Sequence, residues 1–336
     1  MKKAPLIFCV VLAVVAIVAF FLIAPYYKLV TETMNISPVK TVFRIGAPTS
    51  IGQKTNILLL GIGGGAHDGP NLSDSITVLS YDRSANTIRS LGIPRDVWSD
   101  ALQEKVNAAY AIGESIEEGR GLSLAAAEMS SLTGVPIHYS VVVAFDGFKK
   151  IIDYVGGIDV EVEKSFSDPE FPIEGRENDL CGGDDPDYKC RYETVSFEKG
   201  VTHMDGATAL KFVRSRHAEG EQGSDFARSA RQQQVMKALR AHILAPDFLR
   251  DTARVEGLYR LVDEMVVRNV SNQQASVLMR DIVLGGDFKQ ESKALPDEMF
   301  EVPSAYVYGK YVLIPKDGSG DAIRKTVRDY LHISLN

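Results

Sequence analysis

Four arginines lie close together in the stretch His203–Leu239 of a chain whose formal net charge is −7: Arg214, Arg216, Arg228 and Arg231. The guanidinium group is planar and always charged, and its fork of N–H donors fits pairs of phosphate oxygens. Arg228, Arg231 and Gln232 are spaced at i, i+3 and i+4, so a helix would project them from one face. Basic residues in the first turns of a helix oppose its dipole, which favours anions there. The spacing indicates a bound anion, although a solvated basic helix with acidic neighbours explains it equally well.

Two carboxylates flank neighbouring predicted strands. Asp74 comes directly before a strand predicted at Ser75–Tyr81. Asp96, beside Arg95, follows a strand predicted at Thr87–Ile93. If the strands pair as a hairpin, these three side chains lie at one end of the sheet, where ligand sites of open α/β sheets gather. One such carboxylate alone is usually a turn residue. Asp74 and Asp96 beside Arg95, converging with the second arginine cluster, favour a metal-assisted phosphate site.

The stretch GIGGGAHDG at residues 61–69 is rich in glycine. Glycine-rich turns present backbone N–H groups to anions, but this one lacks the Gly-Lys-Ser/Thr ending of a nucleotide loop. We interpret it as a flexible loop or a partial anion-binding nest. The chain has no G-x-S-x-G or HExxH motif, so common hydrolase chemistry has little support. Among the six histidines, we place only His217 near the site.

The N-terminus carries a predicted membrane anchor. Lys2 and Lys3 precede the uncharged apolar run Ala4–Pro25, which approaches the ~20 residues needed to cross a bilayer. A cleaved signal peptide is the alternative, but no good small-x-small cleavage site follows. We expect a cytoplasmic tip and anchor at residues 1–28, a spacer at residues 29–54, and a catalytic domain outside the membrane at residues 55–336.

Composition and cysteine spacing agree with this location. The acidic balance, with a pI of about 5.5, argues against binding to nucleic acid, which needs a basic surface. Cys181 and Cys190 bracket the loop GGDDPDYK, and an oxidising compartment would let them form a disulfide that pins it. Zinc is a weak alternative without further Cys or His partners, and the loop lacks the EF-hand pattern for calcium.

The remaining segments predict a single α/β/α domain of three layers with a mixed central sheet. Further strands are expected at residues 56–61, 138–145 and 157–162, and a pair of short edge strands at 302–315. Helices are expected at residues 105–112, 122–132, 146–154, 252–267, 272–283 and 319–331. The arginine-bearing helix is expected to begin at Ser224 or Asp225, which are both good N-cap residues.

At this point the motifs resemble a known family. LLLGIGG, NLSDSITVLSYD, IRSLGIPRD, KVNAAY, LTGVPIHYSVVVAFDGFKKIIDYVGGIDVEV, GVTHMDGATALKFVRSRH and SDFARSARQQQ closely resemble the LytR-CpsA-Psr family, in unbroken order over Asn56–Leu244. The resemblance implies an α/β domain with an apolar tunnel for a polyprenyl chain. It also implies transfer of a glycopolymer phosphate from a polyprenyl-pyrophosphate carrier to a cell-wall hydroxyl, usually on peptidoglycan.

The resemblance also assigns roles to matching residues. Asp74 would be a ligand of Mg²⁺ or Mn²⁺, and Asp74 or Asp96 would accept the hydroxyl proton. The pyrophosphate would be bound by five arginines: Arg95, Arg214, Arg216, Arg228 and Arg231. Four residues would support them: Asp96, Lys105, Asn107 and Gln232.

One position departs from the family pattern. Members often carry an acidic residue directly after the LLLG strand, where this chain has Ile62-Gly63-Gly64. Either Asp68 substitutes from further along the loop, or metal binding differs. A membrane-anchored phosphotransferase is therefore the leading expectation. Hydrolysis of polyprenyl pyrophosphate by water and non-catalytic binding of a lipid-linked glycan are the alternatives.

Overall fold

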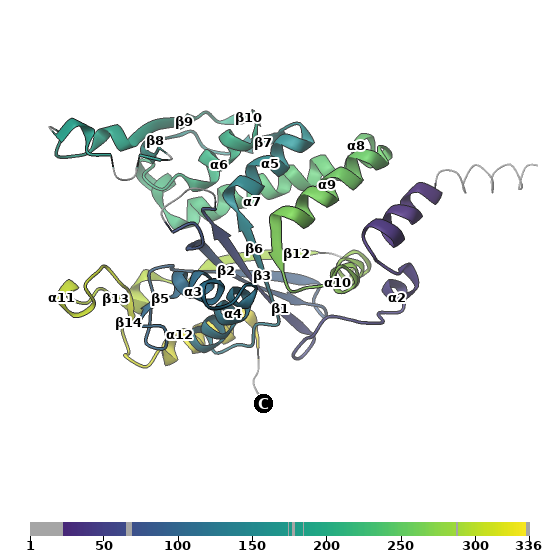
Figure 1. The fold of residues 1–336 in the computed structure, drawn as a ribbon, viewed down its shortest axis with the longest axis horizontal. Helices are drawn as coiled ribbons and strands as arrows, with labels where there is room; N and C mark the ends of the chain where they lie inside the picture. Colours follow the sequence, from purple (N-terminus) through teal and green to yellow (C-terminus); the bar gives the residue numbers. More distant parts are fainter. Residues whose placement is uncertain are drawn as a thin grey trace, which may run out of the picture.

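The computed structural model describes residues 23–64, 69–173, 175–176, 179–183, 185–286 and 288–333. Its centre is a six-stranded sheet with the strand order β11-β6-β1-β2-β3-β12 (Figure 1). The strands are β1 (Lys54–Ile62), β2 (Ser73–Asp82), β3 (Thr87–Ile93), β6 (Tyr139–Ala144), β11 (Val266–Arg268) and β12 (Lys289–Ala294). β1 runs parallel to β6 and antiparallel to β2, and β3 runs antiparallel to β2 and parallel to β12. The mixed central sheet predicted from the sequence is confirmed.

The β2–β3 hairpin turns where the sequence predicted it. The carboxylate of Asp82 accepts hydrogen bonds from the N–H groups of Ser84 and Ala85, at 2.9 and 3.2 Å. Asn86 then adopts a φ of 43°, in the left-handed region that asparagine tolerates better than most residues. This turn fixes the register that pairs Ile76 with Ile93 at the far end of the hairpin.

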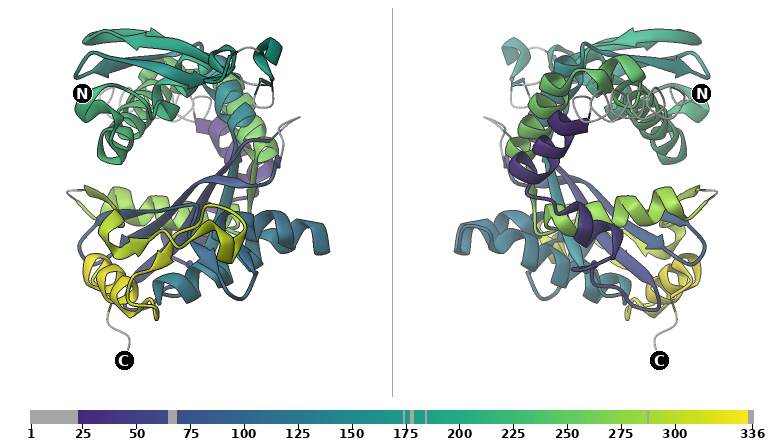
Figure 2. Two further views of the ribbon diagram at one scale, coloured as in Figure 1. Left: turned by 90° about the vertical axis from the view of Figure 1, so that its left-hand side faces the viewer. Right: turned by 90° about the vertical axis from the view of Figure 1, so that its right-hand side faces the viewer.

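One face of the sheet is covered by three helices, which form the lower layer in Figure 2. They are α3 (Ala109–Ile116), α4 (Arg120–Thr133) and α12 (Asp321–Leu331). Side chains that alternate along the strands are buried there, because every second residue of a strand points to the same face. Among them are Leu58, Leu60, Val78 and Leu91. Gly134, with a φ of 68°, ends α4 as the sequence predicted.

A second layer lies over the opposite face and has its own core (Figure 2). Its helices are α5 (Phe145–Val155), α6 (Gly206–Arg214), α7 (Asp225–Ile243), α8 (Pro246–Arg250) and α9 (Thr252–Met265). Its strands form two small antiparallel sheets, β7 (Ile158–Val162) with β10 (Gly200–Met204), and β8 (Phe166–Pro172) with β9 (Tyr192–Phe197). The strand expected at residues 157–162 therefore exists, but it belongs to this layer and not to the central sheet.

The C-terminal part differs from the sequence prediction. A pair of edge strands was expected within residues 302–315, but only β14 (Ile314–Pro315) lies there. It pairs with β13 (Phe300–Glu301), and a short helix α11 (Ala305–Tyr308) occupies the connection. The neighbouring segment folds against the start of the molecule: α10 (Asn272–Leu284) contacts α2 (Pro38–Val42).

The N-terminal prediction is only partly within the described residues. Residues 1–22, which hold most of the expected anchor, lie outside them. Within the described ranges, no helix is both long and apolar enough to cross a bilayer. Residues 29–54, expected as a spacer, contain η1 (Leu29–Thr33) and α2, which contact α9 and α10 respectively.

The predicted disulfide is present in the loop between β8 and β9. Cys181 and Cys190 are bonded, with their Cα atoms 5.6 Å apart. This loop extends beyond the second layer at the left of Figure 1.

Candidate active site

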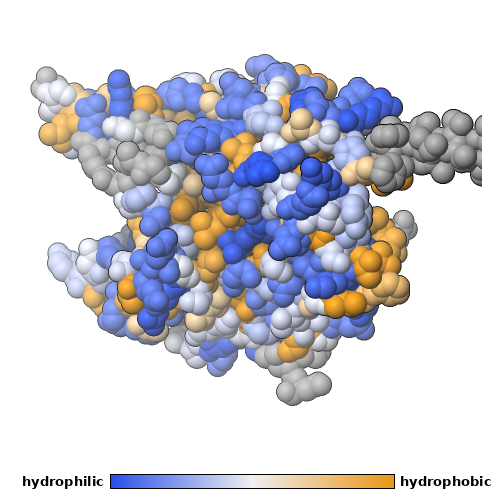
Figure 3. All heavy atoms as spheres, turned by 45° about the vertical axis from the view of Figure 1, so that its right-hand side comes forward, coloured by the Kyte–Doolittle hydropathy of each residue, from blue (hydrophilic) through white to orange (hydrophobic). Residues whose placement is uncertain are grey.

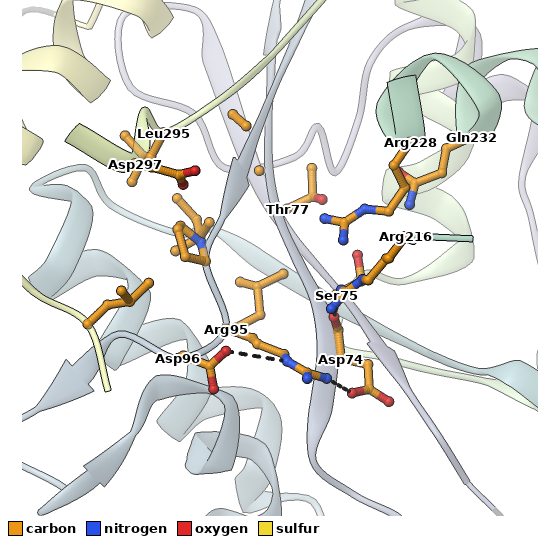
Figure 4. Close-up of a pocket in the computed structure, with 16 residues that line it drawn as sticks. Asp74, Ser75, Thr77, Arg95, Asp96, Arg216, Arg228, Gln232, Leu295 and Asp297 are labelled. Atoms are coloured by element: carbon orange, nitrogen blue, oxygen red, sulfur yellow. Dashed lines mark hydrogen bonds and ion pairs between the residues drawn. The ribbon is translucent and has the colours of Figure 1, made fainter. Parts of the chain in front are cut away.

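Two adjoining cavities open at the end of the sheet where β2 begins and β3 ends. Their volumes are about 200 and 230 Å³. Six residues line both cavities: Asp74, Ser75, Arg95, Arg216, Arg228 and Gln232. Figure 4 shows that the sheet and the loop after β3 supply one wall, whereas Arg216, Arg228 and Gln232 approach from the second layer. Residues predicted from two distant stretches of sequence therefore meet in one place.

The antiparallel pairing of β2 and β3 brings the carboxylates together. Asp74 is the second residue of β2, and Asp96 follows β3 by three residues. The guanidinium of Arg95 donates a hydrogen bond to Asp74, and its Nε lies 3.6 Å from Asp96 (Figure 4). Lys105, at the end of β5 (Glu104–Lys105), places its Nζ 2.7 Å from Asp96. Two carboxylates and two cations thus alternate along this wall.

The arginines of the second layer are positioned by the ends of two helices. Arg214 is the last residue of α6, and Arg216 follows it in the turn. Arg228 lies in the first turns of α7, whose N-cap is Ser224: its side chain accepts the N–H of Ala227. The sequence had offered Ser224 or Asp225 for this role. Arg216 reaches the backbone carbonyl of Asp74, with 3.5 Å between Nη2 and the oxygen.

Arg214 lies in the less polar of the two cavities. Its guanidinium stacks over the ring of Phe145 at 4.6 Å. Phe171, Val213 and His217 also line this cavity, so the histidine that the sequence placed near the site is there. A guanidinium held against aromatic rings keeps a fixed orientation while its N–H edge can still bind an anion.

Arg231 does not line either of these cavities. It is only 2% exposed, and its three guanidinium nitrogens donate to the carbonyl oxygens of Phe212, Ser215 and Gln222. Burial, followed by the nearby Arg228, lowers the pKa of Arg231 to about 10. An α-helix turns by about 100° per residue, so Arg231 lies about 60° to one side of Arg228 and Gln232 about 40° to the other. That difference turns Arg231 into the protein interior.

The structure does not place two other predicted residues, Asn107 and Asp68, in the cavity lining. Asn107 lies half-buried in the 3₁₀ turn η2 (Val106–Ala108), and it does not line the two cavities. Asp68, the expected substitute for the family acid, lies outside the described residues. Lys105 contacts the site indirectly, through Asp96.

Sequence reasoning missed several residues that shape the site. Asp168 is 1% exposed, and its carboxylate accepts the backbone N–H groups of Arg216 and His217 at 3.0 and 3.2 Å. It therefore fixes the turn that carries Arg216. Ser75 and Thr77 line the cavity from alternate positions of β2, a period-two signal that was present in the sequence. Asp297 also lines the cavity and had no such signal.

The described carboxylates limit which residues could hold a metal. Within the described ranges, only Asp179, Cys181 and Cys190 bring three potential ligands together, and the two cysteines are bonded to each other. Three described carboxylates line the first cavity, those of Asp74, Asp96 and Asp297, but they do not lie close enough together to form such a group. Mg²⁺ is commonly held by one or two carboxylates together with waters and substrate phosphates, so Asp74 fits such an ion when a diphosphate is also bound.

Known proteins resemble this chain in sequence and in fold. A model of the LytR_cpsA_psr family matches residues 30–329. TagU of Bacillus anthracis, a polyisoprenyl-teichoic acid–peptidoglycan teichoic acid transferase, is 31% identical over 199 residues, covering 58% of this chain and 54% of TagU. TagV of Bacillus subtilis, which has the same activity in its name, is 27% identical over 289 residues, covering 82% of this chain and 64% of TagV.

The crystal structure of B. subtilis TagV superposes with a TM-score of 0.55 at 25% identity, covering 85% of this chain and 100% of that structure. The chain spans about half the length of the TagU sequences that it matches. The family model, however, extends over almost all of the described residues, and the TagV structure has the same fold. The chain therefore belongs to the LytR_cpsA_psr family.

Proposed function

We propose that this protein transfers a glycopolymer phosphate from a polyprenyl-pyrophosphate carrier to a hydroxyl of peptidoglycan. The observation that carries the proposal is the convergence of three arginines and two carboxylates on one cavity at the end of the sheet: Arg95, Arg216, Arg228, Asp74 and Asp96. Arginine forks are suited to phosphate oxygens, and a diphosphate needs several of them. The names of TagU and TagV, which are teichoic acid transferases, agree with this substrate class.

In the proposed reaction, the acceptor oxygen bonds to the phosphorus that carries the glycopolymer. The bridging P–O bond of the diphosphate breaks, and polyprenyl phosphate leaves. The hydroxyl proton passes to a carboxylate, Asp96 or Asp74. Phosphoryl transfer depends on in-line positioning and on neutralising the charge that develops. Arg216 and Arg228 supply the positive charge from one wall, and Arg95 supplies it from the other. Arg214 adds to this charge from the adjoining cavity, which the first three arginines also line.

A divalent cation, Mg²⁺ or Mn²⁺, belongs to the proposal and would be held by Asp74 together with the diphosphate. Such an ion polarises phosphoryl oxygens and adds to the neutralisation of charge. Arg95 orients Asp74 for that role, because the ion pair between them fixes the carboxylate in the cavity lining. Asp68 stays a second candidate ligand.

The sheet face behind the cavity suits the apolar tail of the carrier. Ser75 and Thr77 share this face with apolar side chains that are only half-buried, unlike the fully buried residues on the other face. These are Ile57, Leu59, Leu79, Val141 and Val143. An apolar strip that leads from a phosphate cavity supports the apolar tunnel expected from the family resemblance.

The location is part of the proposal. We propose that the apolar run Ala4–Pro25 anchors the chain in the cytoplasmic membrane, with the catalytic domain outside. The disulfide between Cys181 and Cys190 supports an oxidising compartment. An anchored domain meets a lipid-linked donor at the membrane surface and the peptidoglycan acceptor beyond it.

The test uses a labelled polyprenyl-pyrophosphate glycan, peptidoglycan and magnesium. Arg214→Ala should reduce transfer on the order of 10²–10³-fold, the usual effect of removing a group that stabilises developing charge, while the circular dichroism spectrum is unchanged. The control is Arg250→Ala, because this exposed arginine of α8 forms an ion pair with Asp247 of its own helix and lines neither cavity. Full transfer by the Arg214 variant would refute the proposal.

Omitting the acceptor separates the alternatives. A transferase leaves the donor intact without peptidoglycan, whereas a pyrophosphate hydrolase consumes it. A binding module would retain the donor unchanged in both reactions.

A further inference from the structure

We propose that the outer face of α2 and α10 docks onto the lipid membrane surface and sets the orientation of the domain. Six apolar side chains on these two helices and at the C-cap of α2 are exposed: Val39, Val42, Phe43, Met279, Val283 and Leu284. Phe43 is 73% and Val283 71% exposed. Figure 3 shows a hydrophobic area on the side of the molecule where α2 and α10 lie in Figure 1. We call these six residues the α2–α10 face.

The polarity of this region is reversed relative to an ordinary surface helix. Thr41 of α2 bonds inward to Ser276 of α10 at 2.8 Å, and the backbone N–H of Ser37 donates to Gln273 at 2.9 Å. Further along, Arg44 forms a 2.9 Å ion pair with Asp281, which is 6% exposed. These polar side chains thus hold the two elements together, whereas the six apolar residues of the α2–α10 face are exposed. Surface helices in water normally show the opposite arrangement.

The position of this face in the chain identifies lipid as its occupant. The apolar run Ala4–Pro25 ends shortly before α2 in the sequence, so an anchor there would deliver α2 directly to the bilayer surface. Tyr27, 60% exposed, lies between the run and α2, and Tyr is the residue type enriched at membrane–water interfaces. Lys40, exposed on α2 itself, suits anionic headgroups. The inference takes the proposed anchor as its attachment point but does not depend on the transfer reaction.

Docking on this face would also fix the position of the candidate site relative to the membrane. The end of α10 is fixed to the β2–β3 hairpin, because Asn86 donates to the carbonyl oxygens of Ile282 and Gly286 at 3.1 and 3.0 Å. Asp74 lies at the other end of β2, about 26 Å from Asp82 at the hairpin end, because a strand rises about 3.3 Å per residue. The half-buried apolar strip of the sheet lies between these two ends. A carrier tail could therefore extend from the membrane side of the domain to the phosphate cavity.

The experiment measures lipid contact by tryptophan fluorescence in the full chain, reconstituted in vesicles with or without brominated acyl chains. The native chain has a single tryptophan, Trp98, whose signal is subtracted. Phe43→Trp reports on the α2–α10 face, and Tyr306→Trp is the matched control. Tyr306 is 101% exposed on α11, at the opposite end of the molecule (Figure 1). We expect brominated lipid to quench most of the fluorescence added at position 43 and little of that added at position 306.

Equal and weak quenching at both positions would overturn the proposal. A blue shift at position 43 without quenching by brominated lipid would also overturn it, because a second copy of the chain would then cover the face. In a second variant, Val42→Asp and Val283→Asp are added to Phe43→Trp. Both valines are exposed, so folding should be retained, as circular dichroism can verify, and quenching should fall. No donor or acceptor is present, so the outcome is independent of whether the protein is a transferase.

Discussion

Arg231 and Arg228 lie three residues apart on α7, yet the structure gives them different tasks, and matched lysine substitutions should separate these tasks. Arg231 is buried and binds three carbonyl oxygens of the segment that carries Arg214 and Arg216. Arg228 lines the phosphate cavity. We predict that Arg231→Lys mainly reduces stability, whereas Arg228→Lys mainly reduces transfer.

The magnitude for Arg231 follows from its hydrogen bonds. Each guanidinium nitrogen serves a different carbonyl, and the single ammonium of lysine can keep one of the three. A hydrogen bond to a charged group contributes about 1.5–3 kcal/mol, so the loss of two costs about 3–6 kcal/mol. That is a large part of the ~5–15 kcal/mol by which native domains are stable. For Arg228→Lys the charge stays and only the fork is lost, so we expect a stability change within about 0.5 kcal/mol.

Urea unfolding followed by circular dichroism, together with the transfer assay at a temperature where both variants are folded, measures the two effects. Arg228→Lys should lower transfer on the order of 10²-fold. The reasoning is refuted if Arg231→Lys unfolds at the same urea concentration as the unsubstituted chain, or if Arg228→Lys is fully active.

Three further predictions concern the fold around the site. Burial lowers the pKa of His138, whose Nδ1 accepts the N–H of Asn56, so the unfolded state binds more protons. The stability that neutral His138 contributes above pH 6.5 should therefore be lost as the pH falls below that value. The melting temperature of a His138→Gln variant should depend less on pH over that range. Gly206→Ala would place a Cβ 2.2 Å from the Lys149 carbonyl oxygen, so α5 and α6 should separate at a cost of about 1–3 kcal/mol, measurable by urea unfolding. Replacing Cys181 and Cys190 by serine should accelerate proteolysis of the β8–β9 loop and lower stability by at most about 2.5 kcal/mol, with unchanged cleavage contradicting the pinning role.

The parts of the fold that were predictable have local signals in the sequence. The residues Asp82–Asn86 predicted the hairpin turn, and Ser224, a good N-cap residue, predicted the start of α7. The convergence of Asp74, Arg95 and Asp96 followed from antiparallel pairing alone. In each case the deciding interaction joins residues that are near each other in sequence or at a fixed register.

The parts that were missed depend on contacts between distant segments. β12 (KQESKA) is an exposed polar edge strand, so it shows no apolar alternation, and only its pairing with β3 defines it. Asp168 acts on the backbone of Arg216, 48 residues away, and no motif marks it. The helical spacing correctly placed Arg231 next to Arg228 on α7. It could not show that three backbone carbonyls of the preceding segment accept hydrogen bonds from Arg231 and hold its side chain in the interior.

The central claim is that one cavity binds the diphosphate while the neighbouring apolar strip holds the lipid. A crystal structure of the chain with a polyprenyl pyrophosphate and magnesium tests it most directly. We predict diphosphate oxygens bound by Arg95, Arg216 and Arg228, the metal on Asp74, and the tail along the sheet face that carries Leu59 and Leu79. A diphosphate bound elsewhere, or a tail that leaves this face empty, would contradict the account.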